Sequence, residues 1–581
     1  SKLSTPDRDL VKNGFHARTL AEELKAPDLE LRVLQSIQDV TVRVNAAVRP
    51  GMSKAEAFAA RRAAIVEIEK ESTEATGLQS DVVTLYQGGL YHLYRYRKHT
   101  DVRLVFAPEY DTAFFGGDPD NFTYPRYDLD ASLFRVYENG KPAKVEHYLK
   151  WSPNGARDGD LVFTSGHPGG TQRLYTVSHL EYLRDYSIPS TIELLERRQA
   201  NLKRYSALGA EQERQVKQEL FGIENSLKRA RGQLGGLKDP TLMAKKQAAE
   251  KALRKAVAAD PKKQAEYGDA WDAIARSRQD LPQLARRQSF LEGTSGIDTR
   301  FFSIARSIVR FVEESRKPEK DRLPEYADAR RAALERQLYS PAPIYKEAEK
   351  FKLAASLAYM VEKLGAEHTA VKKVLAGKAP KARAAELIDS TTLADVAVRK
   401  SLMVGGASAV AASKDSMIQL ARDIDADART IRKRYEDDIV SVERDAYAKI
   451  AQAVFATQGT SAYPDGTGTL RLSYGQVKGY TEASKFVQPF TDIAGLFARQ
   501  EKFGAKPPYD LPQRWDDRKA RLDVKTPLNL VSTNDIVGGN SGSPVVNARG
   551  EIVGLIFDGN IQSLTGYYFY DGSVNRSVSV D

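Results

Sequence analysis

Apolar and polar positions follow two different periods along this chain, and the period changes twice. From about Val82 to Tyr175, short apolar runs bounded by Gly, Pro, Asn and Asp predict β-strands. Between about Pro189 and Thr457, apolar residues recur every three or four positions, which predicts long helices. Strand-like runs return from about Tyr463. The order strands, helices, strands predicts a β region that carries a large helical insertion.

The individual elements can be placed from the same pattern. Strands are predicted at residues 101–106, 133–137, 161–163, 469–474, 528–532, 543–547 and 552–557. Helices are predicted at residues 53–74, 329–338, 348–364 and 417–454, and the clearest apolar stripe is Val216, Leu220, Ile223, Leu227, Ala230 and Leu234. We therefore expect an α+β protein with β regions at residues 1–188 and 461–581 and an α-helical domain at 189–460.

The composition limits the chemistry that the chain can carry. Among its 581 residues there are no cysteines and seven histidines. The absence of cysteine excludes disulfides, an iron–sulfur site, a cysteine nucleophile and thiolate zinc sites. No pair of histidines with a carboxylate has the spacing of metal ligands. We therefore expect no metal and no cofactor.

The distribution of charged residues along the chain indicates which kinds of binding partner to expect. The net charge is +10, from 87 Lys and Arg against 77 Asp and Glu. The basic residues alternate with acids, as in residues 429–444, which is typical of solvated helix faces rather than of a basic patch. We expect no nucleic-acid partner. Because no run of 18 or more apolar residues occurs, we also expect no membrane span.

The strongest local signal for chemistry is the run Val-Gly-Gly-Asn-Ser-Gly-Ser-Pro-Val at residues 537–545, between two predicted strands. Its glycines let the backbone turn with N–H groups on the inside, and the Ser541 hydroxyl can face the same space. The N–H groups of Gly539 and Ser541 would then form an oxyanion hole. The alternative is a glycine-rich hairpin with surface serines. A phosphate-binding loop is disfavoured, because a strand follows and the loop has no Lys.

A nucleophilic serine needs a base and a carboxylate that orients the base. Residues 539–544, Gly-Asn-Ser-Gly-Ser-Pro, look like the Gly-Asp-Ser-Gly-Gly-Pro hexapeptide of chymotrypsin-type peptidases. In those proteins the carboxylate opens a strand, and Asp130 has that place in the run Asp-Leu-Asp-Ala-Ser-Leu-Phe-Arg-Val at 128–136. The alternative reading of Asp130 is an ordinary turn residue before a strand.

Longer motifs make the resemblance more specific. They are residues 101–109, 115–126 (Phe-Gly-Gly-Asp-Pro-Asp-Asn-Phe-Thr-Tyr-Pro-Arg), 166–169, 472–479 and 557–560. With the serine loop, they make the chain similar to the bacterial dipeptidyl-peptidase VII/XI family of serine exopeptidases over essentially its whole length. The resemblance implies a chymotrypsin-like double β-barrel with a large α-helical cap domain inserted. It also implies release of dipeptides from the N-termini of oligopeptides, with Ser541 as nucleophile and Asp130 as orienting carboxylate.

The same resemblance implies how a substrate is held. Asn121, Asp558 and Asn225 would bind the free amine of the peptide, which a carboxylate and two amide oxygens suit. Phe122 stands where many members have Trp. Gly559 stands where the branch specific for acidic residues has Arg, which favours a hydrophobic or broad preference at the second substrate residue. The alternatives are a turn role for Asn121, a solvated Asn225 and a simple turn at residues 558–559.

The family's catalytic histidine precedes the segment that aligns with residues 3–6, so we expect this chain to begin after it. None of the seven histidines here lies in such a motif, and His167 in Gly-His-Pro-Gly belongs to a separate turn. We therefore expect the chain as given to be nearly inactive. The alternative is a non-catalytic binder of free peptide N-termini. The resemblance further implies a periplasmic homodimer, although no signal peptide is present in residues 1–581.

Overall fold

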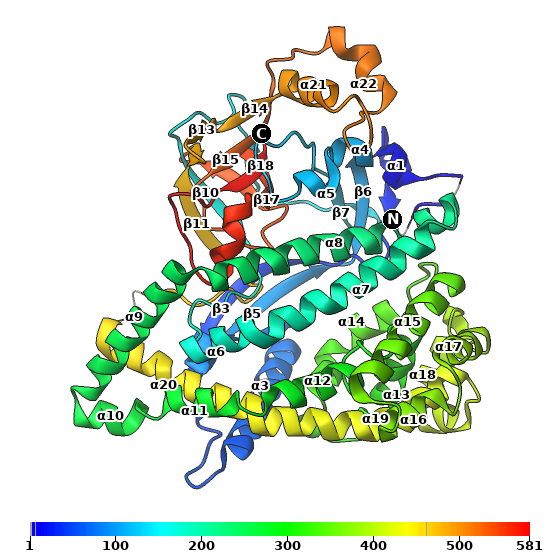
Figure 1. Cartoon of the computed structure of the whole chain (residues 1–581), viewed down its shortest axis with the longest axis vertical. Coiled ribbons are helices and arrows are strands. Elements are labelled where there is room, and N and C mark those ends of the chain that lie inside the picture. Colours follow the sequence, from blue (N-terminus) through cyan, green and yellow to red (C-terminus); the bar gives the residue numbers. More distant parts are fainter. Residues whose placement is uncertain (1–2, 6, 460–461) are drawn as a thin grey trace.

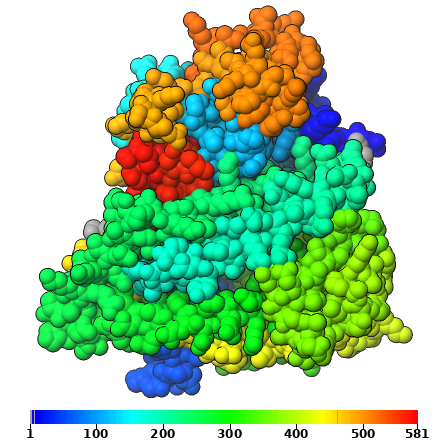
Figure 2. All heavy atoms as spheres, viewed as in Figure 1, coloured from blue at the N-terminus to red at the C-terminus, as the bar shows by residue number. Residues whose placement is uncertain are grey.

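The computed structural model describes residues 3–5, 7–459 and 462–581. It confirms an α+β protein whose two chain ends form the sheets while the middle forms helices (Figure 1). The interval from Ile188 to Gln458, every residue of which is described, contains helices and turns but no strand. In the space-filling view, two of these helices, α7 (Ile188–Ser206) and α8 (Ala210–Lys238), form a band between the C-terminal part of the chain above and other helices of the middle region below (Figure 2).

The predicted strands are present, most of them with bounds shifted by one or two residues. The first part of the chain contains β1 (Phe15–His16), β2 (Leu24–Lys25), β3 (Leu31–Asp39), β4 (Gln79–Leu85), β5 (Leu90–His99), β6 (Asp101–Ala107), β7 (Leu133–Glu138), β8 (Lys141–Pro142), β9 (Lys150–Trp151) and β10 (Leu161–Gly166). The last part contains β11 (Arg471–Gln476), β12 (Tyr480–Glu482), β13 (Lys485–Val487), β14 (Phe490–Asp492), β15 (Pro527–Ser532), β16 (Pro544–Asn547), β17 (Glu551–Gly559) and β18 (Ser577–Val580).

The helices outside the middle region are α1 (Leu10–Asn13), α2 (Thr41–Asn45), α3 (Lys54–Thr76), α4 (Tyr110–Ala113), α5 (Gly117–Asp120), α6 (Val177–Tyr182), α21 (Ile493–Lys502) and α22 (Gln513–Arg518). After α8, the middle region continues with α9 (Pro240–Ala258), α10 (Pro261–Tyr267), α11 (Ala270–Ser277), α12 (Leu281–Leu291), α13 (Arg300–Glu314), α14 (Asp328–Leu338), α15 (Lys346–Leu364), α16 (Thr369–Leu375), α17 (Pro380–Asp389), α18 (Val396–Ala412), α19 (Ser416–Tyr435) and α20 (Ser441–Gln458). Among the described residues, no helix has both the length and the apolar character needed to cross a bilayer.

The strand order places the serine loop in the larger sheet. Eight strands pair in the order β11-β10-β16-β17-β18-β15-β14, with β9 beside β17. A bridge between Val477 and Ser532 joins the end of β11 to β15, so this sheet curls back on itself. Five strands, β1, β2, β6, β7 and β8, form a second sheet, and β3, β5 and β4 form a third. The predicted pair of closed barrels stays a prediction.

Helix α8 brings the helical middle against the serine-bearing sheet. Of its predicted stripe, Val216, Ile223, Leu227 and Ala230 are buried. The opposite side approaches the 3₁₀ turn Ile561–Tyr567, and Gly232 is needed there because a Cβ at that position would lie 2.5 Å from the Leu564 side chain. α8 therefore packs directly on the chain that follows β17.

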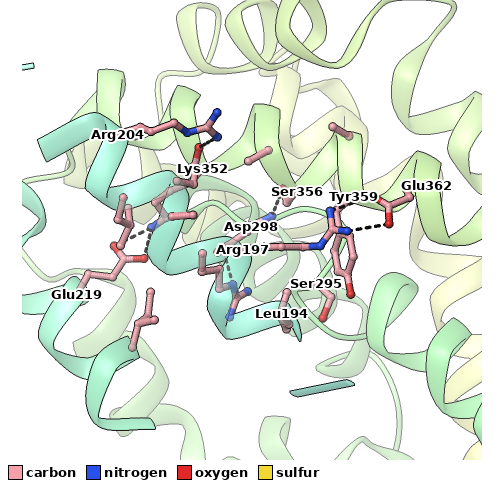
Figure 3. Close-up of a pocket in the computed structure, with 17 residues that line it drawn as sticks. Leu194, Arg197, Arg204, Glu219, Ser295, Asp298, Lys352, Ser356, Tyr359 and Glu362 are labelled. Atoms are coloured by element: carbon pink, nitrogen blue, oxygen red, sulfur yellow. Dashed lines mark hydrogen bonds and ion pairs between the residues drawn. The ribbon is translucent and has the colours of Figure 1, made fainter. Parts of the chain in front are cut away.

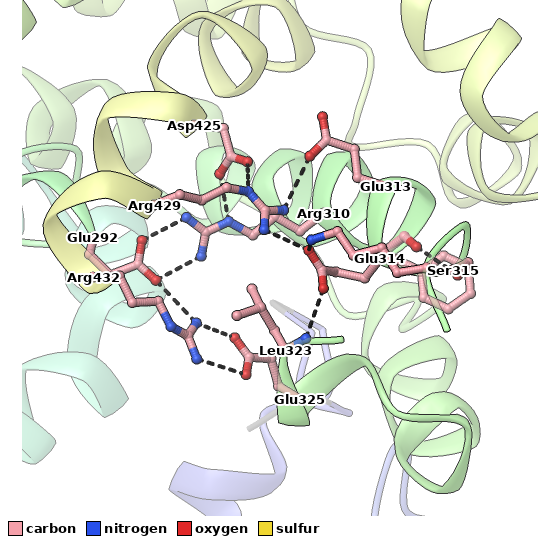
Figure 4. A network of polar contacts seen from close by, with 12 residues as sticks. Glu292, Arg310, Glu313, Glu314, Ser315, Leu323, Glu325, Asp425, Arg429 and Arg432 are labelled. Atoms are coloured by element: carbon pink, nitrogen blue, oxygen red, sulfur yellow. Dashed lines mark hydrogen bonds and ion pairs between the residues drawn. The ribbon is translucent and has the colours of Figure 1, made fainter. Parts of the chain in front are cut away.

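Buried ion pairs join the helices of the middle region (Figure 4). Arg310 of α13 is only 3% exposed and donates to Asp425 Oδ1 at 2.6 Å and to both oxygens of Glu292 at 2.7 and 2.6 Å. Arg429 shares Asp425 and also donates to Glu314, which is fully buried. Each carboxylate in this network has a guanidinium partner.

Replacing Arg310 by Ala should destabilise the protein by about 3–5 kcal/mol, because Asp425 and Glu292 would lose a buried partner. The measurement is the shift in the urea midpoint followed by helical circular dichroism. Arg434→Ala is the matched control, since the Arg434–Asp438 pair is exposed and should contribute less than about 0.5 kcal/mol. Equal shifts for the two variants would contradict this prediction.

Candidate active site

The loop from Val537 to Ser543 turns tightly between β15 and β16. Gly539 has φ +106°, and a Cβ there would lie 2.5 Å from the carbonyl oxygen of His167, so the position requires glycine. The Gly169 N–H donates to the Gly538 carbonyl at 2.8 Å. The predicted Gly-His-Pro-Gly turn therefore packs its backbone against the serine loop.

Some backbone N–H groups of this loop donate hydrogen bonds to the protein and others do not. Gly538, Asn540, Gly542 and Ser543 all donate hydrogen bonds to protein acceptors. The N–H groups of Gly539 and Ser541 have no acceptor in the described part of the chain. Two neighbouring free donors beside a hydroxyl are what an oxyanion hole requires. The two N–H groups that the sequence analysis paired are thus both unused within the described structure.

Ser541 itself is exposed and lies against the end of β17. Its Oγ donates to the Phe557 carbonyl at 3.3 Å. The next residue along β17 is Asp558, so the candidate nucleophile and the candidate amine-binding carboxylate approach one strand end. This proximity comes from the pairing of β16 with β17, which folds the serine loop back over that strand.

Asp558 is buried and its two oxygens are used unequally. Oδ2 accepts from the Phe122 N–H at 2.8 Å and from Arg126 Nη1 at 2.7 Å. Within the described part of the chain, Oδ1 accepts only from the N–H of Gly559, at 2.8 Å, so it keeps accepting capacity. Burial raises the pKa of Asp558, and the nearby Arg126 opposes that rise.

The two candidate amides meet one another next to this carboxylate. Asn121 is buried, and its Nδ2 donates to Asn225 Oδ1 at 3.1 Å. Asn225 comes from α8, and Lys228 one turn later donates to the Asp118 carbonyl at 2.6 Å, which ties α8 to the same loop. Burial lowers the pKa of Lys228. Asn225 is thus half-buried and hydrogen-bonded rather than solvated, and Asn121 does more than close a turn.

Phe122 and Gly559 flank the carboxylate. Phe122 has φ +54°, an unusual value for a residue with a side chain, and this conformation accompanies its N–H bond to Asp558. Gly559 is buried, and a Cβ there would lie 2.3 Å from Ser563 Oγ. A longer side chain at position 559 therefore requires Ser563 to move.

Asp130 lies just before β7; the residue as a whole is exposed, and its carboxylate has no hydrogen-bond partner among the described residues. The surrounding protein nevertheless raises its pKa to about 6, mainly by desolvation, with Asp558 adding to the rise and Arg126 opposing it. Asp130 and Asp558 thus sense one another's charge. No histidine of the described chain hydrogen-bonds to Ser541 or Asp130, and the carbonyl oxygen of His167 lies against Gly539 of the loop.

Sequence reasoning missed Arg126, which lies at the centre of this cluster. It is 2% exposed and donates to Asp128, Asp558 and the Asp120 carbonyl. The one signal for it was its place at the end of the motif at residues 115–126. Asp128 is fully buried, burial raises its pKa to about 7, and its Oδ1 has no hydrogen-bond partner among the described residues.

A separate cavity of about 510 Å³ lies in the helical region between α7, α8 and α15 (Figure 3). Its polar groups are largely paired: Arg197 with Glu362, and Lys352 with Glu219. None of the candidate residues lines it. Helix α8 separates the two places, since it contributes Ile223 to the cavity wall and Asn225 to the candidate site.

Comparison with known proteins gives consistent matches over the whole chain. The family model described as Peptidase S46 matches residues 1–581. "Dipeptidyl-peptidase 7" of Porphyromonas endodontalis is 28% identical over 603 residues, covering 100% of this chain and 72% of that protein. "Asp/Glu-specific dipeptidyl-peptidase" of Shewanella putrefaciens is 27% identical, covering 99% and 84%. The crystal structure of DPP11 of Porphyromonas endodontalis in complex with dipeptide Arg-Asp has a TM-score of 0.78 at 24% identity, covering 100% of this chain and 86% of that one.

Proposed function

This chain belongs to the peptidase S46 family, and on that premise we propose that it is a serine dipeptidyl-peptidase that releases dipeptides from the free N-termini of oligopeptides. The observation that carries the proposal is the pair of unused N–H groups at Gly539 and Ser541, placed beside an exposed hydroxyl. The similar proteins named as dipeptidyl-peptidases support the substrate class.

In this proposal, Ser541 Oγ attacks the carbonyl carbon of the second peptide bond from the substrate's N-terminus. Its proton passes to a histidine base that Asp130 orients, and the N–H groups of Gly539 and Ser541 stabilise the negative charge on the carbonyl oxygen. The base then gives the proton to the leaving amine, which leaves the dipeptide as an ester on Ser541. Water, deprotonated by the same base, hydrolyses that ester. Because no described histidine hydrogen-bonds to Ser541 or Asp130, we assign the role of base to none of the seven histidines of this sequence.

The amine cluster would set the length of the released piece. An ammonium held by Asp558, Asn121 and Asn225 neutralises a buried carboxylate and lies at a fixed place relative to Ser541, because β17 carries both Asp558 and the Phe557 carbonyl that Ser541 contacts. A substrate whose amine is acetylated loses the charge and the donors that this cluster requires.

The decisive experiment uses the protein expressed from its whole gene and a series of oligopeptides analysed by mass spectrometry. We expect successive dipeptides as products and at least about 30-fold slower cleavage of the N-acetylated peptides, the cost of an unpaired buried charge. His167→Ala should leave the rate within a few-fold, because the His167 imidazole makes no hydrogen bond to Ser541 or Asp130 in the described structure. Release of single residues, or equal cleavage of acetylated peptides, would sink the proposal.

A non-catalytic binder of free peptide N-termini is the second candidate, favoured by the lack of a described histidine at Ser541 or Asp130. Covalent labelling by a fluorophosphonate distinguishes the two, because the reagent reacts with an activated serine and not with an ordinary one. Labelling of Ser541 in the protein from the whole gene supports the peptidase. Peptide binding without labelling supports the binder.

We also propose a hydrophobic or broad preference at the second substrate residue, since Gly559 offers no positive charge to an acidic side chain. Gly559→Arg, combined with Ser563→Ala to remove the contact that a Cβ would meet, should raise the ratio of kcat/KM for Asp or Glu over Phe by at least about tenfold, a charge pair's contribution in a partly buried site. Gly559→Met with the same second change is the uncharged control. An equal ratio in both variants would contradict the role of position 559. The periplasmic location and the homodimer stay predictions.

A further inference from the structure

Among the described residues, Arg126 is the one side chain that hydrogen-bonds both to the candidate amine-binding carboxylate and to the segment that carries Asp130. Its Nη1 donates to Asp558 Oδ2 at 2.7 Å, and its Nε donates to Asp128 Oδ2 at 2.8 Å. Asp128 lies two residues before Asp130. The three planar nitrogens of one buried guanidinium thus fix two acidic segments that are 430 positions apart in the sequence, 558 − 128.

The surroundings of Arg126 leave it little freedom. The ring of Phe557 lies 5.4 Å from the guanidinium carbon and the ring of Phe114 lies 5.8 Å from it. The Asp120 carbonyl accepts from Nη1 at 2.8 Å. A lysine at this position has the charge but lacks the planar fork, so it can reach one carboxylate and not hold both in register.

The partner segment is equally fixed. Asn529 is fully buried in β15, accepts from the Asp128 N–H at 2.9 Å and donates to the Asp128 carbonyl at 2.8 Å. These two bonds fix the backbone of Asp128, so the residue cannot change its orientation without breaking them. Any rotation of Asp558 must break its bond to Arg126 or to the Phe122 N–H.

The contact with Arg126 determines how the two oxygens of Asp558 are used. Its Oδ2 is filled by two protein donors, while Oδ1 has one donor and so can accept from a ligand. By binding Oδ2, Arg126 leaves Oδ1 available to a ligand and fixes the orientation of the Asp558 carboxylate. Without Arg126, both oxygens compete for the Phe122 and Gly559 N–H groups, and the buried carboxylate gains protons more readily because its nearest cation is gone.

We propose that Arg126 is a positioning residue that orients Asp558 for the substrate's ammonium and locks it to the Asp128–Asp130 segment. This inference rests on the proposed function, because it takes Asp558 as the amine-binding carboxylate. It adds a residue that contacts no substrate and acts through two carboxylates. It also explains why an arginine that is only 2% exposed lies beside the site with two acidic partners.

The test measures dissociation constants by calorimetry, using the dipeptide Val-Phe and its N-acetyl form with the protein from the whole gene. Dipeptides are products and are not hydrolysed further. In the unmodified protein we expect the free dipeptide to bind at least about 30-fold more tightly than the acetylated one. In Arg126→Met this ratio should fall to about threefold or less, and Arg126→Lys should recover only a small part of it.

The matched control is Arg310→Met, which also removes a buried arginine with two carboxylate partners but lies in the helical region. It should lower stability and leave the binding ratio unchanged, which separates positioning from a general loss of structure. If Arg126→Met does not fold, Arg126→Lys carries the test. A second check is Asp558→Asn, which should abolish the ratio by itself, so that adding Arg126→Lys changes the ratio no further.

The possible results distinguish a failure of the proposed function from a failure of the role of Arg126. If the unmodified protein does not discriminate the two dipeptides, the amine cluster is wrong and the role of Arg126 is wrong with it. If the unmodified protein discriminates and the Arg126 variants discriminate equally, only the role of Arg126 is overturned. If the ratio collapses in the Arg126 variants while the protein releases no dipeptide from peptides, the positioning role holds and the peptidase proposal fails.

Discussion

Replacing Ser541 by Ala should lower kcat/KM for dipeptide release by about 10⁴–10⁶-fold in the protein expressed from its whole gene, while binding of the free dipeptide stays unchanged. The hydroxyl is the only proposed nucleophile, and its loss leaves the N–H groups of Gly539 and Ser541 in place. Those donors stabilise an oxyanion only after a nucleophile has attacked. The measurement is turnover of a chromogenic dipeptidyl substrate together with calorimetric binding.

Ser543→Ala is the control in the same loop. Ser543 is buried two positions further on, faces Gly166 and has no place in the proposed chemistry, so turnover should stay within about tenfold. A fluorophosphonate should label the unmodified protein and the Ser543 variant and leave Ser541→Ala unlabelled. Turnover that survives in Ser541→Ala would remove the serine mechanism.

Periodicity predicted the helical middle well and the N-terminal strands less well. The stripe through Val216, Ile223 and Leu227 could be seen because a helix that buries one face repeats at a fixed spacing. β3 was missed, since nearly all of its residues, including Val33 and Ile37, are exposed. A strand without a buried face has no alternation to detect. The very short strands β1, β2 and β9 give no pattern for the same reason.

The candidate site was only partly predictable, because its parts meet through the fold. The serine loop is local, and a glycine at a position with φ +106° leaves a trace in the sequence. The bond between Asn121 and Asn225 joins positions 104 residues apart, and the bond between Phe122 and Asp558 joins positions 436 apart. Resemblance to a family suggested these residues; spacing alone could not. Apart from its place at the end of the motif at residues 115–126, Arg126 leaves no trace in the sequence, since a buried arginine is recognised by its partners.

Replacing Asp130 by Asn should lower kcat by about 10⁴-fold, because an amide can neither orient a histidine in the same tautomer nor stabilise its cationic form. Binding of the free dipeptide should change little, since Asp130 makes no hydrogen bond to the amine cluster. Stopped assays of dipeptide release and calorimetric binding check the two halves. Asp160→Asn, at an exposed turn near β10, is a matched control that should keep turnover. A small loss of kcat in Asp130→Asn would remove Asp130 from the catalytic group.

The same substitution should stabilise the 581-residue chain at alkaline pH, which follows from the sign of the pKa shift. The folded protein raises the pKa of Asp130 from 3.8 to about 6, mainly by desolvation. A raised carboxyl pKa means that the folded state binds the proton more tightly, so this group's stabilisation is fully present below pH 3.8 and is lost as the pH rises through about 6. Asn does not ionise and removes that loss. We expect a higher Tm for Asp130→Asn than for the unmodified chain at pH 8 and no such gain at pH 3.5. A gain in stability paired with lost turnover would favour a functional role for Asp130, because charged groups that cost stability are typical of active sites. A drop in Tm at pH 8 would instead make it a structural residue.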